Sequence, residues 1–205
     1  SFFFTGDFYR NSKFYDLIKN LIEDGHYLSG HSDKHLLYVD WGNRDSLIIS
    51  KTDLINDIEN NYTAMKSFGI NKAKNKYFLP PFEWHNEKVC KYAEELGVQM
   101  INITPGTMIN QDWTIPTNGK YYSSSELINK LYDFEKNDEN GLNGAIFLMH
   151  FGTHPDRTDK LYNRLDEIIK YLKSKGYEFA TIDIYQNRTK KTSCLFISKT
   201  GENYV

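Results

Sequence analysis

The chain has 205 residues, enough for one sizeable hydrophobic core, and its formal net charge is −2. This near-balanced charge argues against a nucleic-acid interface and against a polybasic membrane patch. No apolar run approaches the ~20 residues that span a bilayer, and no signal peptide is visible, although the sequence starts inside an apolar run without a methionine. We therefore expect a globular domain that has no membrane-spanning segment and does not bind nucleic acid; its oligomeric state is left open.

Strand and helix patterns alternate from the first residues onward. Residues 2–5 have the composition of a buried strand, and apolar residues at helical spacing then lead to Gly25. A short strand follows over residues 26–29. Ser50 is expected to cap the next helix, which ends near Gly69, and Asn86 is expected to cap a later one.

The second half of the chain continues this alternation. The expected strands cover residues 76–79, 98–103, 145–149 and 178–184, and the expected helices cover residues 86–97, 123–134 and 161–176. Such alternation with short connections is typical of an α/β fold, in which helices surround a parallel sheet that is open or closed into a barrel. Residues 1–186 would form this domain. Residues 187–205 would be a C-terminal extension, either one added strand or a docked end.

Two histidines four residues apart, His31 and His35, follow the second predicted strand. On a helical turn this spacing points both side chains the same way. Two converging imidazoles are a common start to a divalent metal site. The alternative is a pair of solvated histidines in a polar loop.

Other candidate residues also follow predicted strands. In an open parallel sheet and in a closed barrel alike, the carboxyl ends of the strands lie along one rim, where active sites usually lie. The candidates at these ends are Asp7, His31, His35, Pro80, Pro81, Phe82, Glu83, Trp84, His85, Asp112, Trp113 and His150. Structural alternatives stay open: Asp7 could cap a helix, His85 could be a surface residue, and the aromatic residues could pack in the core.

The order of these motifs resembles the polysaccharide deacetylases of the NodB-homology type, carbohydrate esterase family 4. The resemblance extends from residue 1 to about residue 186. The segments that carry it are H-S-D-K-H at residues 31–35, F-F-F-T-G at 2–6, Y-F-L-P-P-F at 77–82, D-W at 112–113, L-M-H at 148–150 and K-S-K-G-Y-E-F-A-T-I at 173–182.

The resemblance implies a distorted (β/α) barrel that hydrolyses N- or O-acetyl groups on a carbohydrate polymer, outside the cell or in its envelope. His31, His35 and an aspartate would hold a divalent metal ion of the zinc type. His150 would be the general acid and Asp112 its carboxylate partner. The walls of the substrate pocket would come from Pro81, Phe82, Trp113 and Leu148.

Two departures from the family pattern bear on activity. The T-F-D-D-G segment, which supplies the catalytic base and the third metal ligand, is absent; either the sequence starts at the family's second strand or the protein lacks the segment. Asp7 is a weak substitute. Leu79 stands where the family has an arginine, and leucine makes no charge-assisted hydrogen bond. A catalytically silent carbohydrate-binding module and a metal hydrolase of non-sugar amides therefore remain alternatives.

Overall fold

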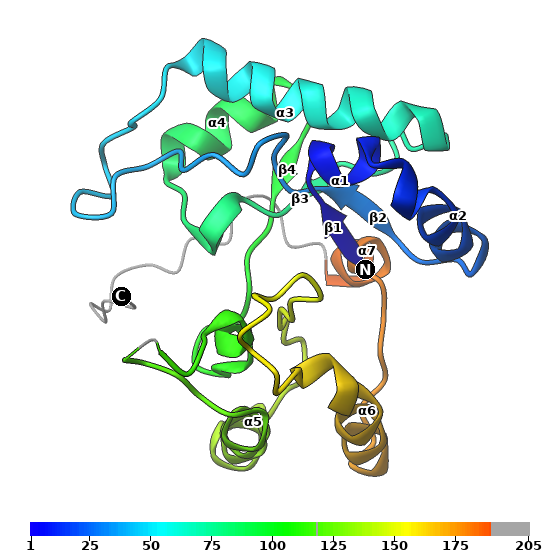
Figure 1. Ribbon diagram of the computed structural model, residues 1–205, viewed down its shortest axis with the longest axis vertical. Helices are drawn as coiled ribbons and strands as arrows, with labels where there is room; N and C mark the ends of the chain where they lie inside the picture. Colours follow the sequence, from blue (N-terminus) through cyan, green and yellow to red (C-terminus); the bar gives the residue numbers. More distant parts are fainter. Residues whose placement is uncertain (118, 190–205) are drawn as a thin grey trace. The chain divides into compact units, whose positions relative to one another are not determined.

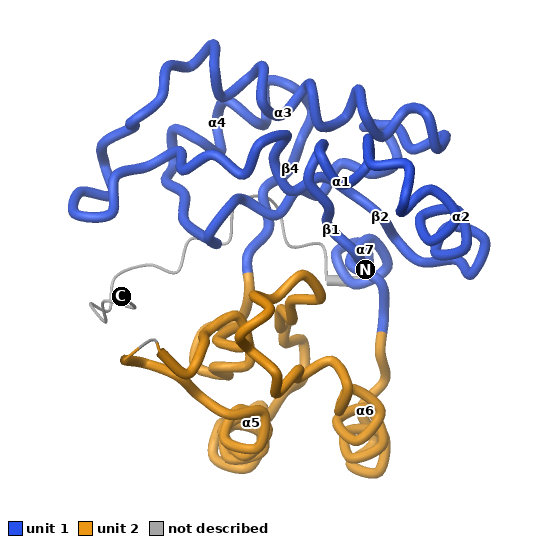
Figure 2. The backbone as a smooth tube through the Cα atoms, viewed as in Figure 1, with its two compact units in different colours: residues 1–102, 180–205 blue, residues 103–179 orange. Residues whose placement is uncertain are grey.

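The computed structural model describes residues 1–117 and 119–189. The chain divides into two compact units (Figure 2). Unit 1 contains residues 1–102 and the described residues from Ala180 onward, and unit 2 contains residues 103–179. Each unit has its own hydrophobic core.

Short parallel strands lie at the centre of unit 1. They are β1 (Phe2–Phe4), β2 (Leu28–Gly30), β3 (Tyr77–Phe78) and β4 (Gln99–Met100). β1 pairs with β2 and β3 pairs with β4, both in parallel. The Leu79 N–H donates to the Gly30 carbonyl at 3.2 Å, so the end of β3 lies beside the end of β2. The strands therefore end together, as the sequence analysis expects for this half of the chain.

Helices cover these strands (Figure 1). They are α1 (Gly6–Arg10), α2 (Tyr15–Glu23), α3 (Lys51–Met65), α4 (Glu87–Glu95) and α7 (Ile182–Thr189), with 3-10 turns η1 (Ser12–Phe14), η2 (Lys66–Phe68) and η3 (Pro81–Glu83). The predicted caps are confirmed, because Ser50 accepts a hydrogen bond from Asp53 N and Asn86 accepts one from Val89 N, both at 3.1 Å. The apolar face of α3 packs against α1, α4 and β2.

Unit 2 is built around two longer helices, α5 (Ser124–Asn137) and α6 (Leu165–Ser174), with 3-10 turns η4 (Ile109–Trp113) and η5 (Leu161–Arg164). Ser123 and Glu126 form a capping box at the start of α5. Buried aliphatic side chains of both helices and of both turns make the core: Ile109, Leu127, Ile128, Leu131, Leu161, Ile168 and Leu172.

Two predicted strands are wrong. Residues 145–149 lie outside any assigned strand, although the Ile146 carbonyl accepts from Thr104 N. Residues 178–184 were expected as a strand, but α7 starts at Ile182, where Tyr185 N donates to the Thr181 carbonyl. A helix satisfies its backbone groups locally, whereas a strand depends on a neighbouring strand. The α/β class is thus confirmed, while closure into a barrel stays a prediction.

The expected boundary at residues 186 and 187 falls inside α7. The proposed added strand in the C-terminal extension lies in residues 190–205, outside the described residues. Among the described residues, none of the helices is both long enough and apolar enough to cross a lipid bilayer.

Candidate functional site

The predicted histidine pair lies in the loop that follows β2 in unit 1. Ser32 and His35 have φ angles of 69° and 55°, in the left-handed region, so the predicted helical turn is wrong. The two imidazole rings nevertheless converge, with centroids 4.9 Å apart and planes at 70°. The irregular backbone, and not helical periodicity, brings them together.

The His31 ring is oriented by the residue that departs from the family pattern. Its Nδ1 lies 2.8 Å from the Leu79 carbonyl oxygen. Because a carbonyl can only accept, the proton is on Nδ1, and the lone pair of the neutral ring is on Nε2. This is the arrangement of a histidine prepared to bind a metal through Nε2. Leu79 itself is buried, with 4% of its surface exposed.

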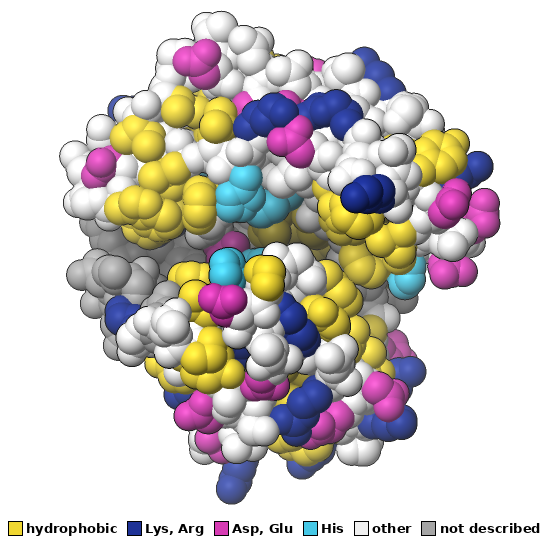
Figure 3. Space-filling model, in the orientation of Figure 1, with side chains coloured by type: hydrophobic (Ala, Val, Ile, Leu, Met, Phe, Trp, Pro, Cys, Tyr) yellow, Lys and Arg dark blue, Asp and Glu magenta, His cyan; other side chains and the backbone are white. Residues whose placement is uncertain are grey.

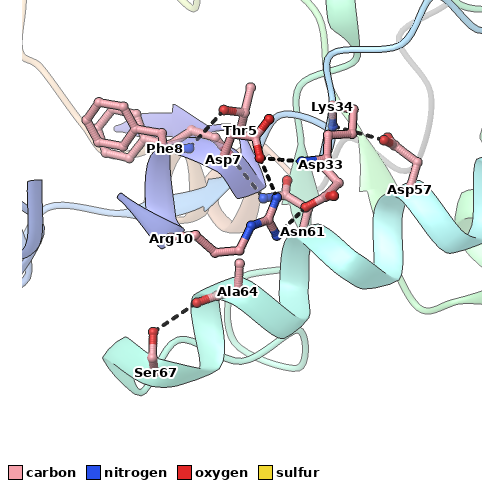
Figure 4. Close-up of polar contacts among 11 residues, drawn as sticks. Thr5, Asp7, Phe8, Arg10, Asp33, Lys34, Asp57, Asn61, Ala64 and Ser67 are labelled. Atoms are coloured by element: carbon pink, nitrogen blue, oxygen red, sulfur yellow. Dashed lines mark hydrogen bonds and ion pairs between the residues drawn. The ribbon is translucent and has the colours of Figure 1, made fainter. Parts of the chain in front are cut away.

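An ion-pair network anchors the histidine loop to the helices (Figure 4). Asp33, 5% exposed, accepts from Arg10 Nη1 at 2.6 Å, and Arg10 also donates to Asp7 at 2.8 Å. The Lys34 ammonium pairs with Asp7, and the Lys34 N–H donates to Asp57 on α3 at 3.1 Å. The segment between the two histidines is therefore fixed on both sides, by α1 and by α3.

Asp7 belongs to this ion-pair network. The cap of α1 is Thr5, whose hydroxyl accepts from Phe8 N at 3.2 Å, so the interpretation of Asp7 as the cap is wrong. Hydrogen bonds from Lys34, then from Arg10, hold the pKa of the Asp7 carboxyl below its usual value. Its carboxylate thus faces two cations of the chain itself.

The metal-donor set is incomplete within the residues that the structure describes. Among them, no group of three histidine, cysteine, aspartate or glutamate side chains is placed to hold a metal ion. His31 and His35 fit two positions of a divalent metal site, by ring convergence and by the His31 tautomer. A further donor would be needed to close the site.

A second predicted pair, Asp112 and His150, comes together in unit 2. His150 Nδ1 lies 2.6 Å from Asp112 Oδ1, and the His150 backbone N–H donates to Asp112 Oδ2 at 2.8 Å. Asp112 lies in η4 and is 1% exposed, whereas the His150 side chain is 31% exposed. The carboxylate therefore fixes both the backbone and the ring of His150 and would stabilise an imidazolium. Its Nε2 is the nitrogen on the side away from the carboxylate.

The predicted pocket walls differ in exposure. In unit 1, Pro81 is buried, while Phe82 is 42% exposed and its ring lies 4.5 Å from the His35 ring. In unit 2, Trp113 is 48% exposed and directly follows Asp112, and Leu148 is half-buried. The structure thus places Phe82 with the histidine pair and Trp113 with the Asp112–His150 pair, each in its own unit.

His85 is buried, 2% exposed, so its expected surface position is wrong. Burial, followed by the positive charge of Arg44, lowers the pKa of this imidazole to about 4. Among the residues that the structure describes, none is a hydrogen-bond partner of its Nδ1. His85 is therefore a neutral core residue of unit 1 near pH 7.

Acid should destabilise the chain through His85. The unfolded imidazole binds a proton near its usual pKa of 6.5, but the folded one does so only near 4. The contribution of His85 to the free energy of unfolding is therefore fully present above about pH 6.5. As the pH drops toward 4, about 3 kcal/mol of unfolding free energy is lost through this residue. Urea unfolding of a His85→Gln variant should show a smaller loss over this pH range. An unchanged pH dependence of the unfolding free energy would contradict this.

Two tryptophans lie near the histidine pair: Trp84 was among the candidates at the strand ends, whereas Trp41 was not. Trp41 lies in the loop before α3 and is 56% exposed. The Trp84 ring stacks on the Trp41 ring, with centroids 5.5 Å apart. The sequence signal for Trp41 was its place in a turn just after the histidine motif.

Comparison with known proteins shows which family the chain resembles. The profile of the polysaccharide deacetylase family matches residues 1–101. The chain is also 27% identical over 184 residues to the peptidoglycan-N-acetylmuramic acid deacetylase PdaA of Bacillus subtilis. This alignment covers 89% of the chain and 59% of PdaA. The first half of the chain is thus similar to the polysaccharide deacetylases. The predicted resemblance is confirmed.

Solved structures of polysaccharide deacetylase relatives share the fold. A carbohydrate esterase family 4 pseudoenzyme from Bacillus anthracis aligns with a TM-score of 0.63 and 20% identity, over 89% of this chain and 53% of that one. A family 4 acetyl xylan esterase from Clostridium thermocellum, solved with a cobalt ion, aligns with a TM-score of 0.62 and 20% identity. The alignment covers 88% of this chain and 73% of the esterase chain. The chain spans 59% of the length of PdaA, so a whole relative contains more than this fold region.

Proposed function

We propose that this protein is a metal-dependent hydrolase that removes acetyl groups from a carbohydrate polymer. The observation that carries the proposal is the orientation of His31, whose Nδ1 is bonded to a backbone carbonyl, so that the lone pair of the ring is on Nε2, the atom through which a histidine oriented in this way binds a metal. The Asp112–His150 pair, in which a buried carboxylate orients a partly exposed imidazole, supports an acid role for His150. The family relationship gives the reaction class.

Each histidine has a proposed role. His31 and His35 would hold a divalent metal ion of the zinc type. Such an ion, when bound, polarises an acetyl carbonyl and activates a water molecule. His150, protonated and held by Asp112, would donate a proton to the leaving amine or hydroxyl of the sugar. Trp113, Leu148, Phe82 and Pro81 stay proposed substrate contacts, of which the exposed Trp113 and Phe82 have the larger accessible surfaces.

The substrate and the compartment follow from the named relatives. PdaA of Bacillus subtilis is named for deacetylating N-acetylmuramic acid in peptidoglycan. A peptidoglycan-N-acetylglucosamine deacetylase of Listeria monocytogenes is 26% identical over 189 residues, which cover 34% of that protein. By analogy, the proposed substrate is an acetylated cell-wall glycan, and the proposed location is the cell envelope or its exterior.

Acetate release tests this function. The protein is incubated with the N-acetylglucosamine pentamer after dialysis against zinc, and a matched sample is treated with a chelator. We expect acetate release in the zinc-loaded sample, loss of release after chelation, and recovery on adding zinc. Absence of release at every metal concentration, with this pentamer and with acetylated peptidoglycan, would refute the proposal.

A catalytically silent carbohydrate-binding module is the second candidate. Leu79 favours it, because a buried aliphatic side chain stands where the family carries an arginine. A structural neighbour in the same esterase family is itself described as a pseudoenzyme. Glycan binding that persists in a His31→Ala variant, with no turnover by either protein, would favour this candidate.

A further inference from the structure

An exposed aromatic surface starts at the histidine pair in unit 1. The Phe82 ring lies 4.5 Å from the His35 ring and 5.5 Å from the Trp41 ring, edge to face in both contacts. Trp41 is 56% and Phe82 is 42% exposed, although both side chains are large and apolar. Hydrophobic and histidine side chains lie side by side on the surface of this unit (Figure 3). The apolar surface is thus continuous with the proposed metal site.

The Trp41 ring is supported from one side. Trp84 stacks on it, with ring planes at 29°, and the Arg44 guanidinium lies 4.3 Å from the Trp84 ring centroid. The Trp84 indole N–H donates to the Asp40 carbonyl at 3.2 Å. A stack of indole, indole and guanidinium therefore holds Trp41 in place while much of its surface faces solvent.

The turn that carries this indole is braced by its own hydrogen bonds. Asp40 Oδ1 accepts from Gly42 N at 2.8 Å and from Asn43 N at 2.7 Å. Arg44 Nε donates to the His85 carbonyl at 2.8 Å, which ties the turn to the segment after η3. Little conformational entropy would be lost when a ligand binds, because the surface is ordered beforehand.

A sugar ring fits this chemistry better than a charged polymer. Trp offers a broad apolar face with a polar tip, which suits a pyranose, whose C–H face is apolar and whose rim carries hydroxyl groups. Arg44 is partly offset by Asp40 and Asp45 in the same turn, so the surface lacks the continuous cationic groove that a nucleic acid requires.

We propose that Trp41 and Phe82, backed by Trp84, form a glycan subsite that stacks against a pyranose ring adjoining the acetylated sugar. We call it the aromatic subsite. The class of ligand, a glycan, rests on the proposed function. The aromatic subsite would in addition make unit 1 prefer longer glycan oligomers. A single sugar would occupy only the acetyl site, whereas a longer oligomer would also contact Trp41.

Calorimetric binding tests this subsite separately from turnover. The full chain, Trp41→Ala and Tyr15→Ala are titrated with the N-acetylglucosamine pentamer and with the monosaccharide. Tyr15 is the matched control, since it is an aromatic residue of the same unit with 46% exposure. We expect Trp41→Ala to raise the Kd for the pentamer about tenfold and to leave monosaccharide binding unchanged. Tyr15→Ala should alter neither.

Three outcomes would overturn the aromatic subsite. Equal pentamer affinity of wild type and Trp41→Ala would show that the indole does not contact the glycan, as would failure of the wild type to bind the pentamer. Trp41-dependent self-association in sedimentation experiments would assign the surface to a second copy of the chain. If the wild type binds the pentamer in a Trp41-dependent way but releases no acetate, the proposed hydrolysis is refuted while the aromatic subsite is supported.

Discussion

Replacing His150 with glutamine is expected to slow acetate release by about two to four orders of magnitude, the usual contribution of a general acid. Glutamine keeps a polar side chain of similar length but cannot carry the proton that the leaving group needs. The side chain is 31% exposed, so the substitution leaves no buried cavity and the fold should persist. Initial rates with the N-acetylglucosamine pentamer measure the effect.

Asp112→Asn provides the companion variant. The amide can accept the His150 N–H as Oδ2 does, but its NH₂ group cannot accept from the ring Nδ1. We expect kcat to fall while KM stays within about twofold, because orientation of the proton donor is lost and sugar contacts are kept. If His150→Gln retains the wild-type rate, the proposed acid role is wrong.

Replacing Gly6 with alanine is expected to destabilise unit 1 by about 2 kcal/mol and to disturb the histidine loop. A Cβ at this position would lie 1.8 Å from Asp33 Oδ1 and 2.9 Å from Arg10 Nη1. The ion pair between the buried Asp33 carboxylate and the partly exposed Arg10 guanidinium must therefore shift, and it anchors the segment between His31 and His35. Urea unfolding followed by circular dichroism measures the loss.

Two controls separate this clash from a general effect of alanine. Gly152 has open space around its Cβ position, so Gly152→Ala should change stability by less than about 0.5 kcal/mol. In an Asp33→Ala background the clashing carboxylate is gone, and adding Gly6→Ala should then cost at most about 1 kcal/mol. An equal loss in both backgrounds would show that Asp33 is not the cause.

Local signals in the sequence predicted local structure well. Ser50 and Asn86 cap their helices as expected, because a cap depends on a side chain and a backbone N–H only a few residues away. The convergence of His31 and His35 was also expected, although through a helical turn that the chain does not form.

Features that depend on distant parts of the chain were harder to predict. The strands expected at residues 145–149 and 178–184 needed partners that a single sequence does not specify. The Trp41–Trp84 stack joins two loops, and neither loop alone indicates that the rings meet. Asp112 and His150 were paired through the family resemblance, and the structure brings their side chains within hydrogen-bond distance; the catalytic role of the pair stays a proposal.

The central claim is that the two histidine groups serve one reaction, and a double-mutant rate comparison tests it most directly. Acetate release is measured for wild type, His31→Ala, His150→Gln and the double variant, all loaded with zinc. Residues that act as a unit are strongly non-additive, so the double variant should be about as slow as the slower single variant. Rate losses that multiply in the double variant, or single variants as active as wild type, would contradict the account.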